Sequence, residues 1–150
     1  MGVLFDYFSA VSDDEAAQVA GWPGGPGCPP PGCPAKDFVV TKIDVCAQLG
    51  RLESLLTGRS YDEITRRPLH AGEVALHPDR GVMTVTDEFS TALATAGDDR
   101  LAAVAGPWAR TDEFWGAADP VELELLLREL RGLARRAHQN GMRLYCWLSL

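Results

Sequence analysis

The C-terminal segment Asp119–Leu150 constrains the fold of this chain more than any other part. The tetrapeptide Asp119–Glu122 predicts a helix start, because aspartate caps free amides, proline suits the first helical position and glutamate completes a capping box. Asn140-Gly141 offers a left-handed stop, and a short apolar strand, Leu144–Leu148, follows. The sequence therefore predicts an amphipathic helix, Pro120–Gln139, that returns directly into a sheet. Its apolar positions recur at helical spacing: Leu123, Leu126, Leu127, Leu130, Leu133, Ala134 and Ala137.

The N-terminal segment Val3–Ala10 predicts a strand with apolar side chains on both faces. Strand residues alternate between the two sides, so Val3, Phe5 and Tyr7 share one face while Leu4 and Phe8 share the other. A strand of this kind belongs in the interior of a sheet. Ser12–Glu15 is a capping box that opens a short helix ending near Ala20.

The middle of the chain predicts shorter elements. A helix with Leu49, Leu52 and Leu56 on one face is expected over Thr41–Gly58, and Cys46 and Cys146 are expected to be small core residues. The remaining elements are a helical turn opened by Ser60–Glu63 and ended by Pro68, a loop over Leu69–Gly81, a strand over Val82–Val85, a helix from Thr86 to Ala96, and a helix that begins at Asp98 and is interrupted near Gly106-Pro107.

These elements predict one α+β domain over residues 1–150. The two terminal strands and Val82–Val85 are expected to form a small, mostly antiparallel sheet covered by amphipathic helices. The length is that of a single domain. The centre of the core is expected at Leu49, Leu52, Leu56, Leu126, Leu130 and Leu133.

The segment Gly21–Pro34 differs sharply in composition from the rest. Its six prolines exclude helix and deny a sheet its donors, so a surface loop with polyproline character is expected, reaching residue 37 and lying outside the core. Cys28 and Cys33 stand in this loop. They are weak candidates for a zinc site completed by His70 and His77, and a disulfide between them is another reading, but free thiols on a surface loop are favoured.

Charge and composition exclude several classes of protein. A net charge of −7 argues against a nucleic-acid partner, because the chain would be repelled by phosphate. No apolar run approaches the roughly 20 residues that span a bilayer, and the N-terminus lacks the basic start of a signal peptide, so a cytoplasmic location without a membrane partner is expected. Only two of the 14 basic residues are lysine, which is typical of a high-GC bacterial genome.

No catalytic or cofactor motif is present. The sequence contains no Gly-x-Ser-x-Gly elbow, no His-Glu-x-x-His helix, no phosphate-binding loop and no Gly-rich dinucleotide turn. His138 lies at the end of the long predicted helix, where a cation favours the helix dipole. An enzyme is therefore not indicated, and no cofactor is predicted.

Several segments together resemble the YfbM-like family of bacterial proteins. The resemblance lies in Met1-Gly2 leading into a strand with Tyr7-Phe8, in the helix from Ile43-Asp44 to Leu55–Gly58, in the entry to the Val85–Leu93 helix, and in the closing helix–strand unit. The Pro-rich loop with its two cysteines departs from the family pattern. The resemblance implies a compact α+β domain and carries no catalytic residue with it.

An aromatic cluster is the first candidate binding site. Trp108, Phe114 and Trp115 fall within eight residues of one another, beside Arg110. Tryptophan and arginine often anchor interfaces. The alternative is that Trp108 and Trp115, two helical turns apart, both pack inward.

The terminal strands carry the second candidate group. Tyr145 and Trp147 share a face of the last strand with Arg143, and Asp6 stands between Leu4 and Phe8 in the first. A buried carboxylate needs a donor, so Asp6 is a candidate partner for Arg143 if the two strands are neighbours.

Two hypotheses of function follow. The first is a non-catalytic module that binds another protein, for instance as an immunity protein, and it rests on the charge, the lack of catalytic motifs and the Trp108–Trp115 segment. The second is a small-molecule-binding protein or enzyme, with a pocket near the 28–33 or 70–77 loops lined by Asp6, Tyr145 or Trp147. The oligomeric state is left open.

Overall fold

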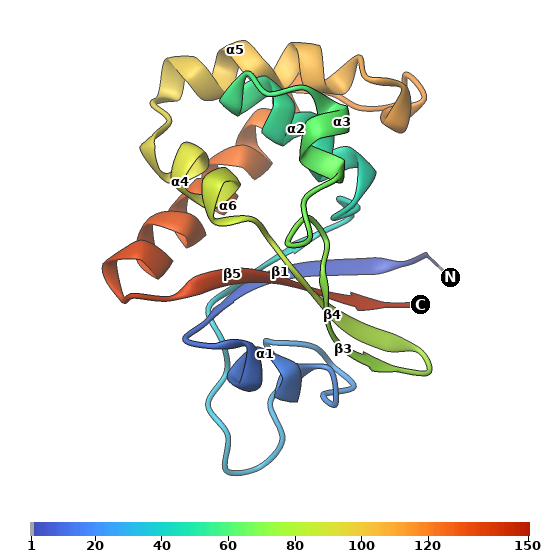
Figure 1. The fold of residues 1–150 in the computed structure, drawn as a ribbon, viewed down its shortest axis with the longest axis vertical. Helices are drawn as coiled ribbons and strands as arrows, with labels where there is room; N and C mark the ends of the chain where they lie inside the picture. The colour runs from blue at the N-terminus through green and yellow to red at the C-terminus, as the bar shows by residue number, and fades with distance from the viewer. Residues whose placement is uncertain (1) are drawn as a thin grey trace.

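The computed structural model describes residues 2–150, which form a five-stranded antiparallel sheet in the order β2-β1-β5-β4-β3. A thick layer of helices covers one face of the sheet, and one short helix and a long loop cover the other (Figure 1). The fold is α+β, as predicted.

The strands of the sheet are β1 (Leu4–Ala10), β2 (Phe38–Thr41), β3 (Glu73–His77), β4 (Arg80–Thr84) and β5 (Arg143–Ser149). The helices are α1 (Asp13–Val19), α2 (Ala47–Thr57), α3 (Tyr61–Thr65), α4 (Asp87–Thr95), α5 (Asp98–Ala109), the 3₁₀ helix η1 (Asp112–Phe114) and α6 (Pro120–Gln139).

The two terminal strands are neighbours in the middle of the sheet. β1 pairs with β5 along its whole length, so that Tyr7 lies opposite Cys146 and Phe8 lies opposite Tyr145. Tyr7 and Cys146 face the thick helical layer, while Phe8 and Tyr145 stack against each other on the second face, with ring centroids 5.7 Å apart. The prediction of an interior strand with two apolar faces is confirmed.

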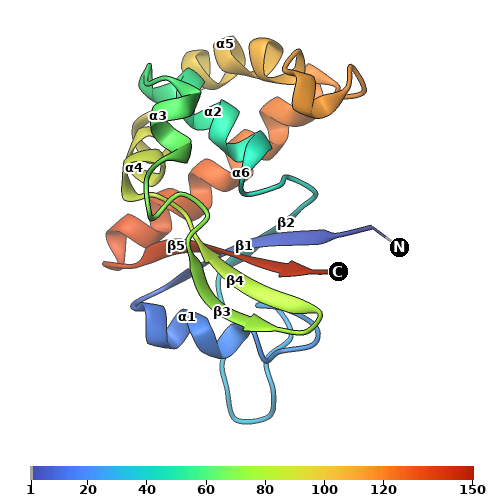
Figure 2. The same ribbon diagram turned by 45° about the vertical axis from the view of Figure 1, so that its right-hand side comes forward.

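The larger core lies between the sheet and helices α2, α4, α5 and α6. Helix α6 crosses the sheet and packs against α4 and α5, which lie beyond it (Figure 2). Of the predicted core leucines, Leu49, Leu52, Leu130 and Leu133 are buried. Leu56 and Leu126 are only partly buried and pack against the margin of this core.

The predicted helix ends are confirmed at four helices. Ser12, Ser60 and Thr86 each accept a hydrogen bond from the amide three residues later, at 3.2, 3.2 and 3.1 Å. Asp119 accepts from the Val121 amide at 2.9 Å, and Gly141 has the left-handed φ of 65° that ends α6. These short polar side chains satisfy amides that no helical carbonyl can reach.

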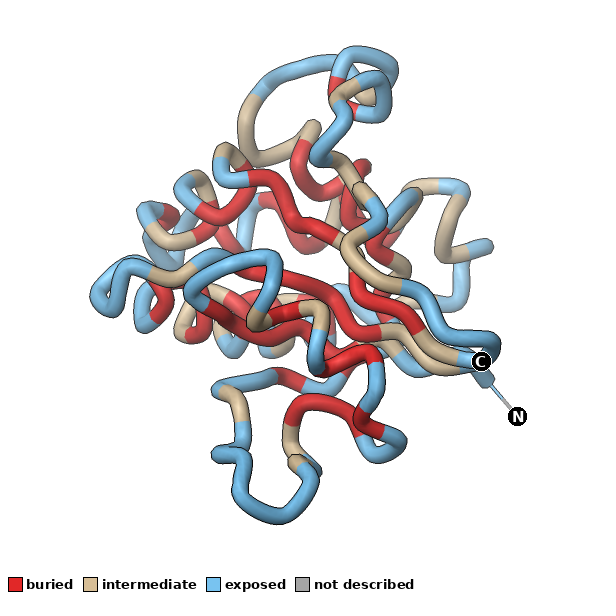
Figure 3. The backbone as a smooth tube through the Cα atoms, turned by 60° about the horizontal axis from the view of Figure 1, so that its bottom comes forward, coloured by how far each residue is buried: buried red, intermediate tan, exposed pale blue. Residues whose placement is uncertain are grey.

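A second, smaller core fills the other face of the sheet. Helix α1 packs there with Phe8, Tyr145 and Trp147, and Trp22 from the Pro-rich loop is also buried. The central strands are buried on both faces, and buried residues continue into the first part of the Pro-rich loop (Figure 3). The prediction that Gly21–Pro34 lies outside the core is therefore wrong for its first third, since Trp22 is an anchor. The tip from Pro30 to Pro34 is exposed, as predicted.

The loop is built from three consecutive Pro-Gly turns and not from a continuous polyproline helix. Hydrogen bonds close the turns Trp22–Gly25, Gly25–Cys28 and Pro30–Cys33, with N to O distances of 3.1, 3.0 and 3.1 Å. Proline fixes the first central position of each turn and glycine follows it. The loop lies so close to the sheet that a Cβ at Gly25 would stand 3.1 Å from the Trp147 ring.

Two strands were not expected from the sequence. Residues Phe38–Thr41 form β2, so Thr41 ends a strand and does not begin the predicted helix. The Thr41 hydroxyl donates to the Phe5 carbonyl and ties the segment to β1. Helix α2 therefore begins only at Ala47, and Cys46 is exposed before it, so the prediction that Cys46 is a core residue is wrong. Cys146 is buried, as predicted.

The predicted loop Leu69–Gly81 contains β3 and the start of β4, joined by the turn at Pro78-Asp79. A register shift between Glu73 and Ala75 interrupts the pairing of β3 with β4. Helix α5 continues through Pro107, contrary to the predicted interruption. The carbonyl that Pro107 leaves without a helical donor belongs to Ala103, which is exposed, so water can replace the missing bond.

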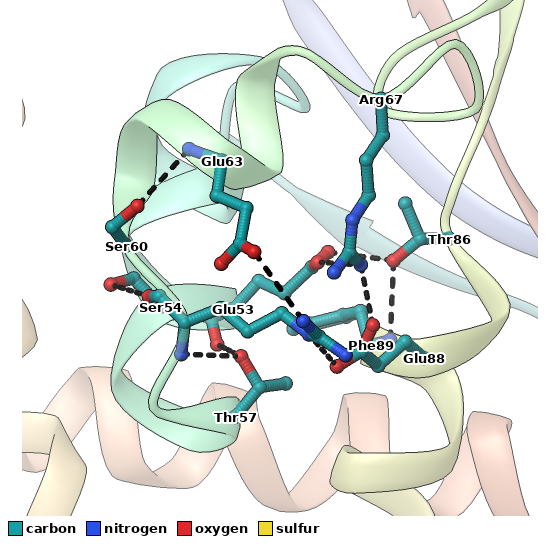
Figure 4. A network of polar contacts seen from close by, with 10 residues as sticks. Glu53, Ser54, Thr57, Ser60, Glu63, Arg67, Thr86, Glu88 and Phe89 are labelled. Carbon is teal, nitrogen blue, oxygen red and sulfur yellow. Dashed lines mark hydrogen bonds and ion pairs between the residues drawn. The ribbon is translucent and has the colours of Figure 1, made fainter.

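A polar network joins α2, α3 and α4 at one edge of the helical layer (Figure 4). Glu53 is 2% exposed and accepts a hydrogen bond of 2.6 Å from the hydroxyl of Thr86, the residue that caps α4. Arg67 lies 3.6 Å from the second Glu53 oxygen and also bonds Glu88, which Arg59 reaches at 2.6 Å. A buried carboxylate is stable here because it is paired and hydrogen-bonded.

Replacing Gly25 with alanine is expected to destabilise the protein more than replacing Gly32. Both glycines have a left-handed φ, of 81° and 87°, so both substitutions carry a similar backbone cost of about 1–2 kcal/mol. Only at Gly25 would the new Cβ press on the Trp147 ring, which adds about 1–3 kcal/mol of overpacking. Urea unfolding of the two variants measures the difference, and equal losses would contradict the packing of the loop against Trp147.

Candidate protein-binding surface around Trp115

Trp115 is the most exposed large side chain at the helical end of the molecule. It is 88% exposed, whereas Trp22, Trp108 and Trp147 are buried. Its backbone is left-handed, with φ 50° and ψ 31°, a conformation that costs a bulky L-residue about 1–2 kcal/mol. Gly116 follows with φ 72°, so two left-handed residues in succession turn the chain from η1 toward α6. The ring is thus held in solvent by an unfavourable backbone.

The segment before Trp115 is fixed to the core by aromatic packing. Trp108 is fully buried at the end of α5 and donates its indole N–H to the Gln48 carbonyl of α2 at 2.9 Å. The Phe114 ring meets the Trp108 ring edge to face, with centroids 5.3 Å apart and an interplanar angle of 84°. This geometry suits the quadrupoles of the two rings. This packing fixes Phe114, and with it the backbone that leads into Trp115.

Polar contacts add a second attachment of η1 to α2. The Gln48 amide donates to the Glu113 carbonyl at 3.2 Å, and Arg51 donates to the Glu113 carboxylate at 3.1 Å. The Arg51 guanidinium also lies 3.8 Å above the centre of the Tyr61 ring, which is a cation–π contact. Trp115 consequently projects from a segment that is braced on both sides.

A pocket of about 250 Å³ opens beside Trp115, between η1, the start of α6 and the segment after β2. Its walls are mostly apolar, and Lys42, Asp119 and Glu122 bring charges of both signs; the lining also includes Ile43, Gln48, Phe114, Trp115, Ala117, Ala118 and Leu123. A second hollow of about 210 Å³ lies beside η1 and contains Arg51, Arg110, Asp112 and Glu113.

The structure thus brings together the four residues of the predicted aromatic site. Trp108 and Phe114 support the surface from below, while Trp115 and Arg110 are exposed. The alternative in which both tryptophans pack inward holds for Trp108 and fails for Trp115. The left-handed conformation of Trp115 could not be foreseen, because the sequence signal for it, a glycine, stands one position later at Gly116.

The other three candidates lie on the opposite side of the sheet and belong to its second core. Trp147 is buried beneath Gly25, and its indole N–H has no hydrogen-bond partner among residues 2–150. The Tyr145 hydroxyl donates to Asp13 at 2.7 Å, and burial followed by this hydrogen bond raises the pKa of Tyr145. Asp6 is 7% exposed, and burial raises the pKa of its carboxyl.

The predicted contact between Asp6 and Arg143 is not formed. The strands are neighbours, but Asp6 lies opposite Trp147, and Arg143 lies opposite Ala10. Four residues along a strand separate the two side chains by about 13 Å. Arg143 instead approaches Asp87 at 4.0 Å.

The four weak metal candidates are not assembled into one site. His70 hydrogen-bonds to the Cys46 carbonyl at 2.9 Å beside α2, whereas His77 lies near Gly21 on β3, and the thiols of Cys28 and Cys33 are exposed in the loop. Within the part of the chain that the structure describes, no three His, Cys, Asp or Glu residues are grouped as metal ligands.

Two polar features escaped the sequence analysis. The Ser90 hydroxyl lies 3.0 Å from His138 Nε2, but Ser90 is buried between α4 and α6, so this contact joins two helices. The second feature is a pocket beside Lys36 at the far end of α6. Neither had a sequence motif, since both combine residues far apart in the chain.

No protein-family model, curated protein or solved structure matches this chain. The resemblance to the YfbM-like family therefore remains a prediction. Among residues 2–150, no helix is both long and apolar enough to cross a membrane.

Replacing Asp6 with asparagine is expected to stabilise the protein at neutral pH. The folded state raises the pKa of Asp6, so it binds the proton more tightly than the unfolded state, and wild-type stability falls as pH rises through the raised pKa. Asparagine avoids this loss, and its advantage should disappear at pH below the ordinary aspartate range. Thermal unfolding from pH 3 to 8 measures the trend, and a variant that loses stability at neutral pH would contradict it.

Replacing Trp115 with glycine is expected to leave the free energy of unfolding unchanged or to raise it by up to about 1 kcal/mol. Relief of the left-handed conformation is partly offset by the added flexibility of glycine in the unfolded chain. Truncating the buried Trp108 to alanine should instead cost about 3–5 kcal/mol. Urea unfolding separates the two, and a loss above about 1 kcal/mol for Trp115→Gly would show that its ring stabilises the fold.

Proposed function

We propose that this chain is a non-catalytic protein-binding module whose binding surface is centred on Trp115. The observation that carries the proposal is the 88% exposure of an indole that the backbone holds in a left-handed conformation. Such a residue adds little to folding and exposes a large apolar ring to water. Sparsely populated backbone conformations of this kind cluster at functional sites such as ligand clamps.

The surroundings of Trp115 support an interface with a protein. Arginine and tryptophan are enriched among residues that dominate binding energy. Arg110, which directly follows the last residue of α5, is exposed. The two flanking hollows carry charges of both signs, which suits the polar rim of a protein interface. The rigid attachment of η1 to α2 reduces the entropy that binding would otherwise cost.

Burial of the Trp115 indole in an interface would contribute a substantial share of a binding free energy. Burying an indole removes about 150–250 Å² of surface from water, equivalent to about 4–6 kcal/mol at 25 cal/mol per Å². Truncation of such an anchor commonly costs at least about 2 kcal/mol, or roughly a thirtyfold loss of affinity. The identity of the partner decides whether the module acts as an immunity protein.

The proposal predicts that a photo-crosslinking amino acid placed at Ala117, in the wall of the pocket beside Trp115, will capture one defined protein in cells of the source organism. The same probe at Asp79, in the turn between β3 and β4, is the matched control at a distant exposed site. Trp115→Ala combined with the Ala117 probe should reduce the adduct at least about thirtyfold.

Mass spectrometry of the crosslinked product identifies the captured protein. Capture that is equal from Ala117 and Asp79, or that is unaffected by Trp115→Ala, would contradict the proposed surface. Trp115→Gly serves as the folding control, because it is expected to keep or raise stability while it removes the ring.

A further inference from the structure

A separate pocket of about 230 Å³ lies at the other end of α6, where β1 ends and β2 begins. Helix α1, the segment after the Pro-rich loop and the turn between α6 and β5 all contribute walls to it. The lining is formed by Ser9, Glu15, Pro34, Ala35, Lys36, Asp37, Asn140 and Met142. Its size is below the roughly 300 Å³ at which pockets for drug-sized ligands begin, so a ligand must be small.

Within the described chain, Lys36 is the one cationic residue that lines this pocket, beside the carboxylates of Glu15 and Asp37. Its side chain is only 12% exposed, and its ammonium donates to Glu15 Oε1 at 2.7 Å. The other Glu15 oxygen accepts from the Val11 amide at 2.7 Å, and these contacts, that of Lys36 first, lower the pKa of the Glu15 carboxyl. An ammonium has three donors, and only one is used by a residue that the structure describes.

Ser9 supplies a second free donor. Ser9 lines the pocket and is 4% exposed, and its backbone amide donates to the Asp37 carbonyl at 3.2 Å. No hydrogen bond between residues 2–150 engages its hydroxyl. The Ser9 hydroxyl and the two remaining Lys36 donors are therefore available to a ligand in the pocket.

The charges around the pocket limit the ligand further. Asp37 is held by two hydrogen bonds from Arg136, at 2.6 and 3.1 Å, so neither of these residues is free. Glu15 and Asp37 place two carboxylates near the entrance, which would repel a dianion more strongly than a monoanion. The backbone amides of Asn140 and Met142 both donate to the Ala137 carbonyl at the end of α6, so neither amide is free for a ligand.

We propose that this pocket binds a small monocarboxylate, whose oxygens accept hydrogen bonds from Lys36 and Ser9 while its short apolar part contacts Met142 and Pro34. This site is independent of the Trp115 surface. A carboxylate of three to six non-hydrogen atoms matches the donors in number and the pocket in size.

The chain offers a direct measurement, because Lys36 and Lys42 are its only lysines. Selective ¹³C-lysine labelling should therefore give two Cε signals, which the Lys42→Arg variant assigns. Titration with acetate, propionate or L-lactate at constant ionic strength is expected to shift the Lys36 signal in a saturable manner and to leave the Lys42 signal in place. Propionamide, a neutral analogue of propionate, should cause no shift, and inorganic phosphate should bind more weakly.

Two variants test the assigned donors. Ser9→Ala should weaken binding about tenfold through loss of one hydrogen bond to a charged acceptor. Glu15→Gln should tighten binding, because it removes the charge that competes for Lys36. The thermal midpoint of each variant is recorded so that a folding defect is recognised, and the Lys42→Met variant should bind like the wild type.

The proposal is overturned if none of the three acids shifts the Lys36 signal saturably up to about 50 mM, since a site with two directed donors should exceed this affinity. It is equally overturned if propionamide shifts the signal as propionate does, or if both lysine signals move together. Unchanged binding in a folded Ser9→Ala variant would also overturn the proposal, because the ligand is assigned a hydrogen bond from Ser9.

Discussion

The two central strands must be covered on both faces, and the rest of the architecture follows from this requirement. β1 and β5 place Tyr7 and Cys146 toward the helices and Phe8, Tyr145 and Trp147 toward the opposite side. Large aromatic side chains gain most of their stabilisation only when fully removed from water. A single helical layer would leave half of this surface exposed, so the chain must supply a second cover.

That second cover is assembled from very little regular structure. Helix α1 has seven residues and packs over Phe8 and Tyr145. The Pro-rich loop covers what remains, with Trp22 inserted beside the helix and Gly25 lying flat against the Trp147 ring. Proline restricts the unfolded loop and so reduces the entropy lost when it is ordered, while glycine permits the close approach. A composition that suggests a mobile insertion thus produces a part of the core.

The predictions from sequence succeeded where local signals and burial agree. Helix α6 has the predicted bounds, because its cap, its leucine stripe and its left-handed stop all act within a few residues. β2 and β3 could not be found in this way. They are edge strands whose apolar residues, such as Val40 and Leu76, are more than half exposed, so they lack the burial pattern that marks an interior strand. Glu53 was missed for a related reason, since its partner Arg67 becomes a neighbour only when α2 and α3 pack together.

The same distinction between local signals and tertiary contacts applies to the candidate sites. The sequence located Trp108, Phe114 and Trp115 as a cluster, but the exposure of Trp115 depends on the turn that two left-handed residues make. The pocket at Lys36 depends on four segments that meet only in the folded chain. Sequence reasoning can therefore find a site made from one continuous segment, whereas a site made from distant segments requires the tertiary structure.

Helix α6 separates the two proposed sites and also explains why they should act independently. Its 20 residues span about 30 Å, with the Trp115 surface at its start and the Lys36 pocket at its end. Arg131 and Arg135 donate to the Ala96 and Ala94 carbonyls at 3.1 and 2.8 Å, which fixes the helix to the end of α4. Coupling between distant sites requires an element with two arrangements that both ligands bias. A helix that buries one face along its length and is held by these bonds offers one arrangement, so occupancy at one end should leave affinity at the other end unchanged.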